Sequence, residues 1–260
     1  MAATIHATAL VHQSAHIGPG ADIGAFAIIG ADVHIGADTM VGPYTRIEGP
    51  AKIGARNRIV GHTSIGTDPQ DVKFHGERTQ IEVGDDNYIR EFVTFNRGTV
   101  GGGGITKIGS RNFFMAYSHV GHDGNVGSDT IFANAATLAG HVTVADHATV
   151  GAFSAVHQFC NVGEHAFIGG GTIATQDVLP YVKTVGNRPA KTYGINTIGL
   201  QRKGFSRETV EALQRAYRIL VRSKLRLEDA LTRIDSELGE FPEAKYLVTF
   251  VRAAQRGIIR

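Results

Sequence analysis

The stretch that decides the fold runs from Ile108 to Ile168 and reads IGSRNFFMAYSHVGHDGNVGSDTIFANAATLAGHVTVADHATVGAFSAVHQFCNVGEHAFI. In it a large apolar residue recurs at every sixth position, beginning with Ile108, Phe114 and Val120. A period of six is neither the 3.6 of an α-helix nor the 2 of an amphipathic strand. It is typical of a short strand followed by a tight corner, repeated, with the apolar residue always pointing inward.

The same period extends over the N-terminal part of the chain. Every sixth residue from Ile5 to Ile65 is aliphatic, and a glycine or another small residue often follows it. The pattern is interrupted over 67–80 and again at Gly101–Gly104. Three hexads make a triangular coil of about 18 residues, which pairs with the next coil about 4.8 Å away. The sequence therefore predicts a parallel β-helix over residues 1–189, with the interruptions as projecting loops.

After about residue 190 the spacing changes to that of helices. Apolar residues recur at Val210, Leu213, Tyr217 and Leu220. Ser206 is suited to the N-cap of this helix, and further helices are predicted near 227–238 and 242–256. We therefore expect an α-helical C-terminal domain over 190–260. Such a domain can cover the open strand edges at the end of the prism.

Composition narrows the class of protein. A formal net charge of +2 gives no whole-protein field that favours nucleic acid. A single cysteine, Cys160, suits a reducing compartment. The N-terminus lacks the pattern of a signal peptide, and no apolar run is long enough to span a membrane. We expect a cytoplasmic protein without stable membrane insertion.

Basic residues gather in the helical region. Residues 202–226 contain Arg202, Lys203, Arg207, Arg215, Arg218, Arg222, Lys224 and Arg226. Only Glu208 and Glu211 oppose them. This segment is either an ordinary solvated helix surface or a docking face for an acidic or phosphate-bearing partner.

A polar column follows from the coil length alone. His122, Gly140 and Gln158 are 18 residues apart, so they should lie above one another on successive coils. His141 and His157 stand directly beside that column. We expect the three histidines to cluster, whereas an isolated corner histidine would be read as a solvated turn residue.

The residue types in this column favour acyl or proton transfer. Histidine is the natural general base near neutral pH. Gly140 lacks a side chain, so its backbone N–H can reach a developing oxyanion. Asp123 can orient the imidazole of His122 or stabilise its charge. These three residues are the candidate catalytic groups.

Two other interpretations compete with this one. His119, His122 and His141 can also be read as a zinc site like that at the subunit interfaces of hexapeptide carbonic anhydrases. Those proteins are shorter and have no large helical domain, so we predict no metal. The remaining interpretation is a non-enzymatic scaffold, which the column of stacked polar residues does not favour.

Several motifs in chain order resemble the UDP-N-acetylglucosamine acyltransferase family, whose members begin lipid A assembly. They are Gln70–Glu77, Ile89–Glu91, Arg97–Val100, His119–Asp123, Leu138–Val142, Ala155–Cys160, Gln176–Val178, Gly186–Asn187 and Gly204–Glu208. Because they span nearly the whole chain, the resemblance is more specific than the repeat. It implies a left-handed β-helix, a homotrimer with active sites between subunits, and no cofactor.

The resemblance also implies roles for individual residues. His122 would deprotonate the glucosamine 3-hydroxyl of UDP-N-acetylglucosamine, and the Gly140 N–H would stabilise the intermediate formed with the acyl carrier protein thioester. The groove for the two substrates would be lined by Asp71, Lys73, Asn96, His119, His141, His157, Gln158, Asn196, Arg202 and Lys203. Gly170 would leave room for a long acyl chain.

The chain departs from the family pattern at two positions near the substrates. Asn96 stands where the family usually has histidine, and Ile198 where it usually has glutamate. An acceptor with an amine at C3 is therefore an alternative, since the same base and oxyanion hole would serve it. A coenzyme A-dependent acyltransferase of the same fold is a second alternative, and the basic segment 202–226 favours the carrier protein over it.

Overall fold

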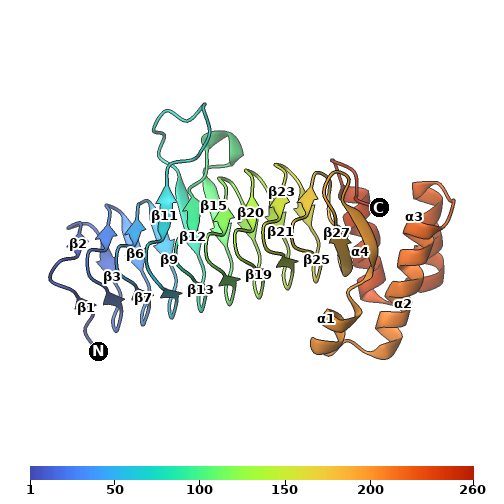
Figure 1. Ribbon diagram of the computed structural model, residues 1–260, viewed down its shortest axis with the longest axis horizontal. Coiled ribbons are helices and arrows are strands. Elements are labelled where there is room, and N and C mark those ends of the chain that lie inside the picture. Colours follow the sequence, from blue (N-terminus) through green and yellow to red (C-terminus); the bar gives the residue numbers. More distant parts are fainter.

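Short parallel strands wind into a three-sided prism in the computed structural model, which describes residues 1–260 (Figure 1). The coil is a left-handed parallel β-helix, as predicted. Sheet A contains β1 (Thr4–Ile5), β4 (Asp22–Ile23), β7 (Met40–Val41), β10 (Arg58–Ile59), β13 (Tyr88–Ile89), β16 (Phe113–Phe114), β19 (Ile131–Phe132), β22 (Thr149–Val150), β25 (Phe167–Ile168), β27 (Val182–Val185) and β28 (Lys191–Ile195).

Two further sheets complete the prism. Sheet B contains β2 (Leu10–Val11), β5 (Ile28–Ile29), β8 (Arg46–Ile47), β11 (Ser64–Thr67), β14 (Thr94–Asn96), β17 (His119–Val120), β20 (Thr137–Leu138), β23 (Ala155–Val156) and β26 (Ile173–Ala174). Sheet C contains β3 (His16–Ile17), β6 (Val33–Ile35), β9 (Ala51–Ile53), β12 (Gln80–Val83), β15 (Ile105–Ile108), β18 (Asn125–Val126), β21 (Thr143–Val144) and β24 (Asn161–Val162). The corners between sheets are named here A–B, B–C and C–A.

The apolar residue of each hexad points into the prism. A single cluster of 36 buried residues runs through it, and Phe95, Phe114 and Phe132 are its largest fully buried members. Phe114 stacks on Phe132 and meets Phe95 edge-on, with ring centroids 4.8 Å apart in both pairs. In these three successive coils an aromatic side chain fills the core, where the other coils have isoleucine or valine.

The corners require a residue with positive φ in nearly every coil. Asp123 (φ 58°), His141 (φ 60°) and Phe159 (φ 64°) occupy equivalent places on the B–C corner. Because a left-handed residue turns the chain sharply, its side chain lies beside that of the preceding residue instead of on the opposite face. This geometry matters for the site described below.

The two interruptions of the period project from the B–C corner, as Figure 1 shows above β11, β12 and β15. The first joins β11 to β12. The second joins β14 to β15 and contains the short 3₁₀ helix η1 (Val100–Gly102). Arg97 ties them together: it donates to the carbonyl of Gly66 at 2.9 Å, pairs with Asp68, and lies over the ring of Phe74.

The C-terminal region is helical, with α1 (Thr197–Arg202), α2 (Arg207–Tyr217), the π-helical segment η2 (Arg218–Arg222), α3 (Leu227–Leu238) and α4 (Pro242–Ala253). Ser206 caps α2 through a 3.1 Å hydrogen bond from the Thr209 N–H, as predicted. The helix expected over 242–256 ends earlier, at Ala253, because the chain turns back to the prism. There the N–H of Ile259 donates to the carbonyl of Asp177 at 2.9 Å.

The helices cover the end of the prism with a second core of 20 buried residues. This core includes Leu179, Tyr181 and Val182 from the last coil together with apolar residues of α2, α3 and α4. β28 lies after the predicted boundary at residue 189 and pairs antiparallel with β27 before it. The division into 1–189 and 190–260 stays a prediction. None of the helices is long and apolar enough to cross a membrane.

Candidate active site

The predicted stacking of His122 on Gly140 is present at the B–C corner. A Cβ atom added to Gly140 would lie 2.5 Å from Cε1 and 2.6 Å from Nε2 of His122. The imidazole therefore lies directly over the Cα of Gly140, in space that any other residue would fill. The Gly140 N–H makes no hydrogen bond within the chain. The arrangement places an unpaired backbone donor beside the free nitrogen of a histidine.

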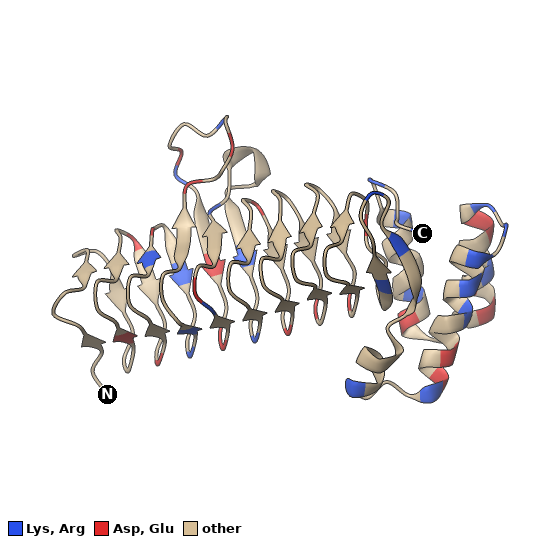
Figure 2. Cartoon of the chain, in the orientation of Figure 1, with Lys and Arg blue, Asp and Glu red and all other residues tan.

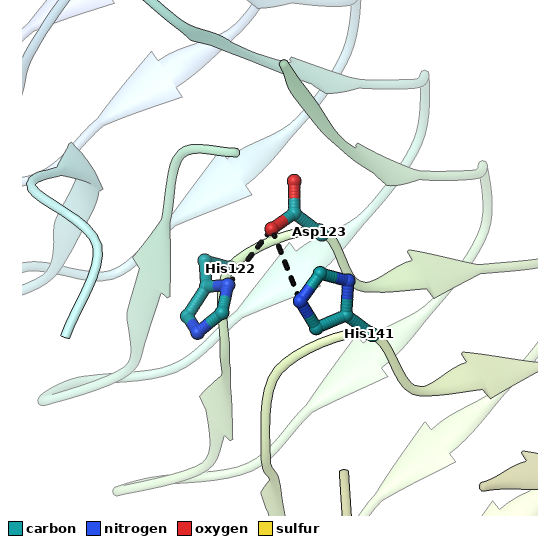
Figure 3. Close-up of side chains that lie close together, drawn as sticks. All are labelled: His122, Asp123 and His141. Carbon is teal, nitrogen blue, oxygen red and sulfur yellow. Dashed lines mark hydrogen bonds and ion pairs between the residues drawn. The ribbon is translucent and has the colours of Figure 1, made fainter. Parts of the chain in front are cut away.

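His122 and Asp123 form a hydrogen-bonded pair. Nδ1 of His122 lies 2.8 Å from Oδ2 of Asp123, whose carboxylate is buried (Figure 3). A carboxylate only accepts hydrogen bonds, so Nδ1 carries the proton and Nε2 keeps its lone pair. Sequence neighbours on a strand face opposite ways, but the positive φ of Asp123 brings both side chains to one side. The carboxylate of Asp123 is thus in contact with the imidazole of His122, as its predicted orienting role requires.

His141 completes the cluster from the next coil. Its ring stands edge-on to that of His122, with centroids 5.1 Å apart, and its Nε2 lies 3.7 Å from Oδ2 of Asp123. On its other side His141 stacks on Phe159 at 4.4 Å. Phe159, which the sequence did not single out, thereby fixes the plane of the His141 ring.

The other two predicted histidines lie at the margin of the cluster. His119 on β17 has Nδ1 2.7 Å from Oγ1 of Thr94, and burial lowers the pKa of its imidazole, assisted by the nearby His122. His157 is exposed, and its Nδ1 lies 3.2 Å from the carbonyl oxygen of Gln158. It makes no ring contact with His141, whose neighbour in that coil is Phe159.

The same cluster offers a set of possible metal ligands. One ligand atom each of His122, Asp123 and His141 lies within 4.8 Å of the other two. His119, which the zinc interpretation required, is not among them because it faces Thr94. Asp123 already accepts hydrogen bonds on both oxygens, so a cation would have to replace them. The donor set therefore fits a hydrogen-bonded base better than a metal centre.

Residues of the projecting loops lie at the same corner. Asn96 is buried and donates from Nδ2 to the carbonyl of Asp68 at 2.9 Å and to Oγ1 of Thr67 at 3.2 Å. Asp71 accepts a 3.0 Å hydrogen bond from the N–H of Lys73, whose side chain is exposed. These residues shape the loop beside the cluster.

The remaining predicted residues lie elsewhere on the chain. Asn196 caps α1 and, with Arg202 and Lys203, lines a cavity of about 540 Å³ against the outer face of sheet A, near the C–A corner. Ile198 lines the same cavity. Gly170 lies on the A–B corner, where an added Cβ would meet only backbone atoms of Ala152, the nearer at 3.3 Å. Within one chain the predicted groove is thus divided among three corners.

Comparison with known proteins gives consistent results along the chain. Residues 177–259 match the family model described as UDP-N-acetylglucosamine O-acyltransferase, domain 2. The acyl-(acyl-carrier-protein)–UDP-N-acetylglucosamine O-acyltransferase of Alkalilimnicola ehrlichii is 49% identical over 197 residues, which is 76% of each chain. The protein of the same name from Myxococcus xanthus is 47% identical over 212 residues, 82% of each chain.

Solved structures extend the similarity to the whole fold. The UDP-N-acetylglucosamine O-acyltransferase of Moraxella catarrhalis is 40% identical, with a TM-score of 0.95 over 98% of this chain and 99% of that one. The enzyme of Bacteroides fragilis is also 40% identical, with a TM-score of 0.96 over 99% and 100% of the two chains.

A parallel β-helix that holds a histidine–carboxylate pair over a bare glycine N–H, closed by a helical cap, defines a hexapeptide-repeat transferase. The sequence identity to the relatives described above, and the share of each chain that is covered, then show which family of such transferases this is. The chain belongs to the UDP-N-acetylglucosamine O-acyltransferase family.

Proposed function

We propose that the protein moves a 3-hydroxyacyl chain from the thioester of acyl carrier protein to the 3-hydroxyl of UDP-N-acetylglucosamine, the first step of lipid A assembly. The observation that carries this proposal is the placement of His122, with Nδ1 on Asp123 and its other edge over Gly140. The names of the relatives supply the two substrates. The chemistry follows from the site.

The reaction begins with a proton transfer. Nε2 of His122 takes the proton of the sugar 3-hydroxyl as its oxygen attacks the thioester carbonyl carbon. Asp123 stabilises the resulting imidazolium through the hydrogen bond at Nδ1. When the tetrahedral intermediate collapses, the C–S bond breaks, and His122 returns the proton to the thiolate of the carrier protein. The product is an ester, and the base is regenerated.

Gly140 contributes to the reaction in two ways. Its N–H, free of other partners, donates to the oxyanion that forms from the thioester carbonyl. Its missing side chain leaves the space in which the His122 ring lies. Other turn residues at this place, such as Gln158, also have free N–H groups, but only Gly140 accommodates the imidazole.

Replacing Gly140 by alanine is expected to lower kcat by about 100-fold, because the new methyl would occupy the position of the His122 ring. KM for UDP-N-acetylglucosamine should change little. Steady-state kinetics would measure both. Gly101→Ala is the matched control, since no atom lies within 4 Å of an added Cβ there. Equal activity of both variants would contradict the assigned role of Gly140.

The divided groove becomes one site if three copies assemble. The base lies at the B–C corner, whereas the cavity formed by α1 lies against sheet A near the C–A corner. If the B–C corner of one subunit packs against this cavity on the next subunit, His122 lies in the same site as Asn196, Arg202 and Lys203. Both amide and guanidinium donors suit the nucleotide and its diphosphate. We therefore place UDP-N-acetylglucosamine between subunits.

The distribution of exposed apolar side chains supports this packing. Those on the outer faces of the prism belong to sheets A and B: Met40, Ile131 and Phe167, and Leu10 and Ile28. The outer face of sheet C instead carries polar residues such as Lys52, Glu82, Lys107 and Asn125. Sheets A and B are therefore the faces suited to a partner, and sheet C is suited to water.

The A–B corner would then lie on the threefold axis. It carries an exposed column of stacked rings, Phe26, Tyr44, His62, Phe92 and Tyr117, whose neighbouring centroids are 4.8 to 5.4 Å apart. Such a column is unfavourable in water and favourable where three copies meet. We propose that Gly170, further along the same corner, leaves room for the end of the acyl chain.

Acyl carrier protein, which is acidic, is expected to bind the helical domain. Figure 2 shows Lys and Arg along these helices among acidic residues. Several of the basic residues are paired, for instance Arg207 with Glu211 and Arg215 with Glu237. Within residues 202–226, the exposed basic side chains without an ion pair are Arg202, Lys203, Arg218, Arg222, Lys224 and Arg226. Their uncompensated charge is available to a partner.

Reversing two of these charges, in Arg218→Glu with Arg222→Glu, is expected to raise KM for acyl carrier protein by about 10-fold or more. KM for UDP-N-acetylglucosamine and the maximal rate should stay within about twofold, since the chemistry is unchanged. Lys245→Glu is the control, because Lys245 is an exposed lysine of α4 without an ion pair. Equal effects of the control and the double variant would contradict docking at η2.

The proposed function is tested by supplying purified protein with 3-hydroxyacyl carrier proteins of several chain lengths and UDP-N-acetylglucosamine. Mass spectrometry of the products should show the O-acylated sugar nucleotide and the preferred chain length. Parallel reactions contain the 3-amino acceptor or acyl-coenzyme A. Product only from the amine would assign Asn96 and Ile198 to acceptor choice, and product only from coenzyme A would overturn the donor. A cytoplasmic location stays a prediction.

A further inference from the structure

The carboxylate that orients His122 is itself held by a residue outside the repeat. Asp123 accepts hydrogen bonds from the N–H of Thr99 at Oδ1 (2.8 Å) and from the hydroxyl of Thr99 at Oδ2 (2.6 Å). The second is shorter than the bond from Nδ1 of His122 to the same oxygen, 2.8 Å. Both Thr99 and Asp123 are buried, so these bonds are shielded from water.

The second interruption of the period brings Thr99 to this place. Thr99 caps η1, and its Oγ1 accepts a 3.1 Å hydrogen bond from the N–H of Gly102 while its proton goes to Asp123. Gly102 lies against the carboxylate: an added Cβ would fall 1.9 Å from Cγ of Asp123. The hydroxyl therefore has one donor role and one acceptor role, both satisfied, and cannot rotate freely.

Asp123 has a second histidine within reach. Nε2 of His141 lies 3.7 Å from Oδ2, so a rotated or displaced carboxylate could bond His141 instead of His122. The backbone of Asp123 is fixed by a 2.8 Å bond from its N–H to Oγ1 of Thr106, which leaves the side-chain torsions to be set by other contacts. The two bonds from Thr99 set them.

We propose that Thr99 is a positioning residue that directs the Asp123 carboxylate to Nδ1 of His122 and away from His141. This inference rests on the proposed role of His122 as the base. Thr99 would act on the rate of proton transfer alone, through Asp123, without touching substrate. The loop inserted between β14 and β15 thus serves the catalytic pair as well as the outline of the groove.

A double-mutant cycle with Asp123→Asn tests the proposal. Thr99→Val keeps the N–H but removes the hydroxyl, and it should lower kcat about 10-fold while each KM stays within about twofold. In the Asp123→Asn background the same change should have almost no further effect, because the group it positions is gone. Thr99→Ser should restore activity to within about twofold of the parent. An equal loss from Thr99→Val in both backgrounds would overturn the proposal.

A second variant changes the packing of the Asp123 carboxylate against the loop. Gly102→Ala places a methyl against Cγ of Asp123, so it should lower kcat and lose its effect in the Asp123→Asn background in the same way. If the loss of activity only matched the loss of folded protein, measured by thermal unfolding, Thr99 and Gly102 would contribute to stability and not to positioning. Failure of His122→Ala to reduce activity would instead contradict the proposed function, so the two failures are distinguishable.

Discussion

Replacing His122 by alanine is expected to lower kcat for acyl transfer by about 100- to 10,000-fold at neutral pH, the range for loss of a general base. His122 is the residue whose ring lies over Gly140 and whose Nδ1 is held by Asp123. Removing it should leave the proposed oxyanion donor, Gly140, and the proposed substrate groove intact. KM for both substrates should therefore stay within a few-fold of the parent values.

The measurement is product formation by mass spectrometry on a variant whose oligomeric state matches the parent. His12→Ala is the control, because His12 lies on the same B–C corner, is exposed, and its ring hydrogen-bonds with Ser14 and not with the candidate site. Its activity should be unchanged. Parental activity in His122→Ala would refute the mechanism, and an equal loss in both variants would indicate a structural effect of corner histidines.

Much of the fold follows from the sequence because the period fixes both the strands and their register. The equal spacing of His122 and Gly140 places one over the other, and the structure confirms this contact. The helical cap follows from helical spacing and the Ser206 cap. In these segments the local sequence pattern agrees with the overall fold, so the pattern alone is sufficient to predict the structure.

The period says nothing about residues inside the interruptions. Thr94 pairs with His119 across 25 residues, not 18, because the second loop lies between them. Thr99 lies within that loop, and the six-residue period does not predict its hydrogen bond to Asp123. A left-handed corner conformation, needed for Asp123 to turn toward His122, is also set by tertiary context. His122 and Asp123 were candidates from the sequence, but Thr99, which holds Asp123, was not.

The period does not indicate the division of the groove either; only the family resemblance implied sites between subunits. A period tells which residues share a corner, so it groups His122 with Gly140 and Gln158. It does not tell which corner of a second copy faces them. Asn196 and Arg202 lie beyond the repeat, and their place against sheet A depends on how α1 packs on the last coils. In the proposed trimer a neighbouring copy joins the two halves.

Introducing a charge on the A–B corner should dissociate that assembly. In Phe92→Asp with Tyr117→Asp, two carboxylates replace adjacent stacked rings that are 43% and 61% exposed in the single chain. At a threefold axis each would meet its own copies, and burying an unpaired charge costs about 3 kcal/mol or more. Sedimentation or light scattering should then show monomers for the variant and trimers for the parent.

Activity should fall with assembly, because a monomer separates His122 from the cavity that contains Asn196 and Arg202. We expect at least a 100-fold loss at concentrations where the variant is monomeric, with the loss smaller at high concentration as trimers re-form. The monomer itself should stay folded, since both replaced rings are exposed and the core is untouched.

Asn125→Asp is the matched control for this experiment. It adds one carboxylate, half the charge of the corner variant, on the outer face of sheet C, where Asn125 is exposed and which the proposed trimer leaves in water. That variant should remain trimeric and active. If it dissociated and the corner variant did not, sheet C would be the interface, and the B–C corner could then meet the sheet A cavity only by a different arrangement of subunits. A corner variant that became monomeric yet kept full activity would mean that one chain holds a complete site, with His122 acting without the residues of α1.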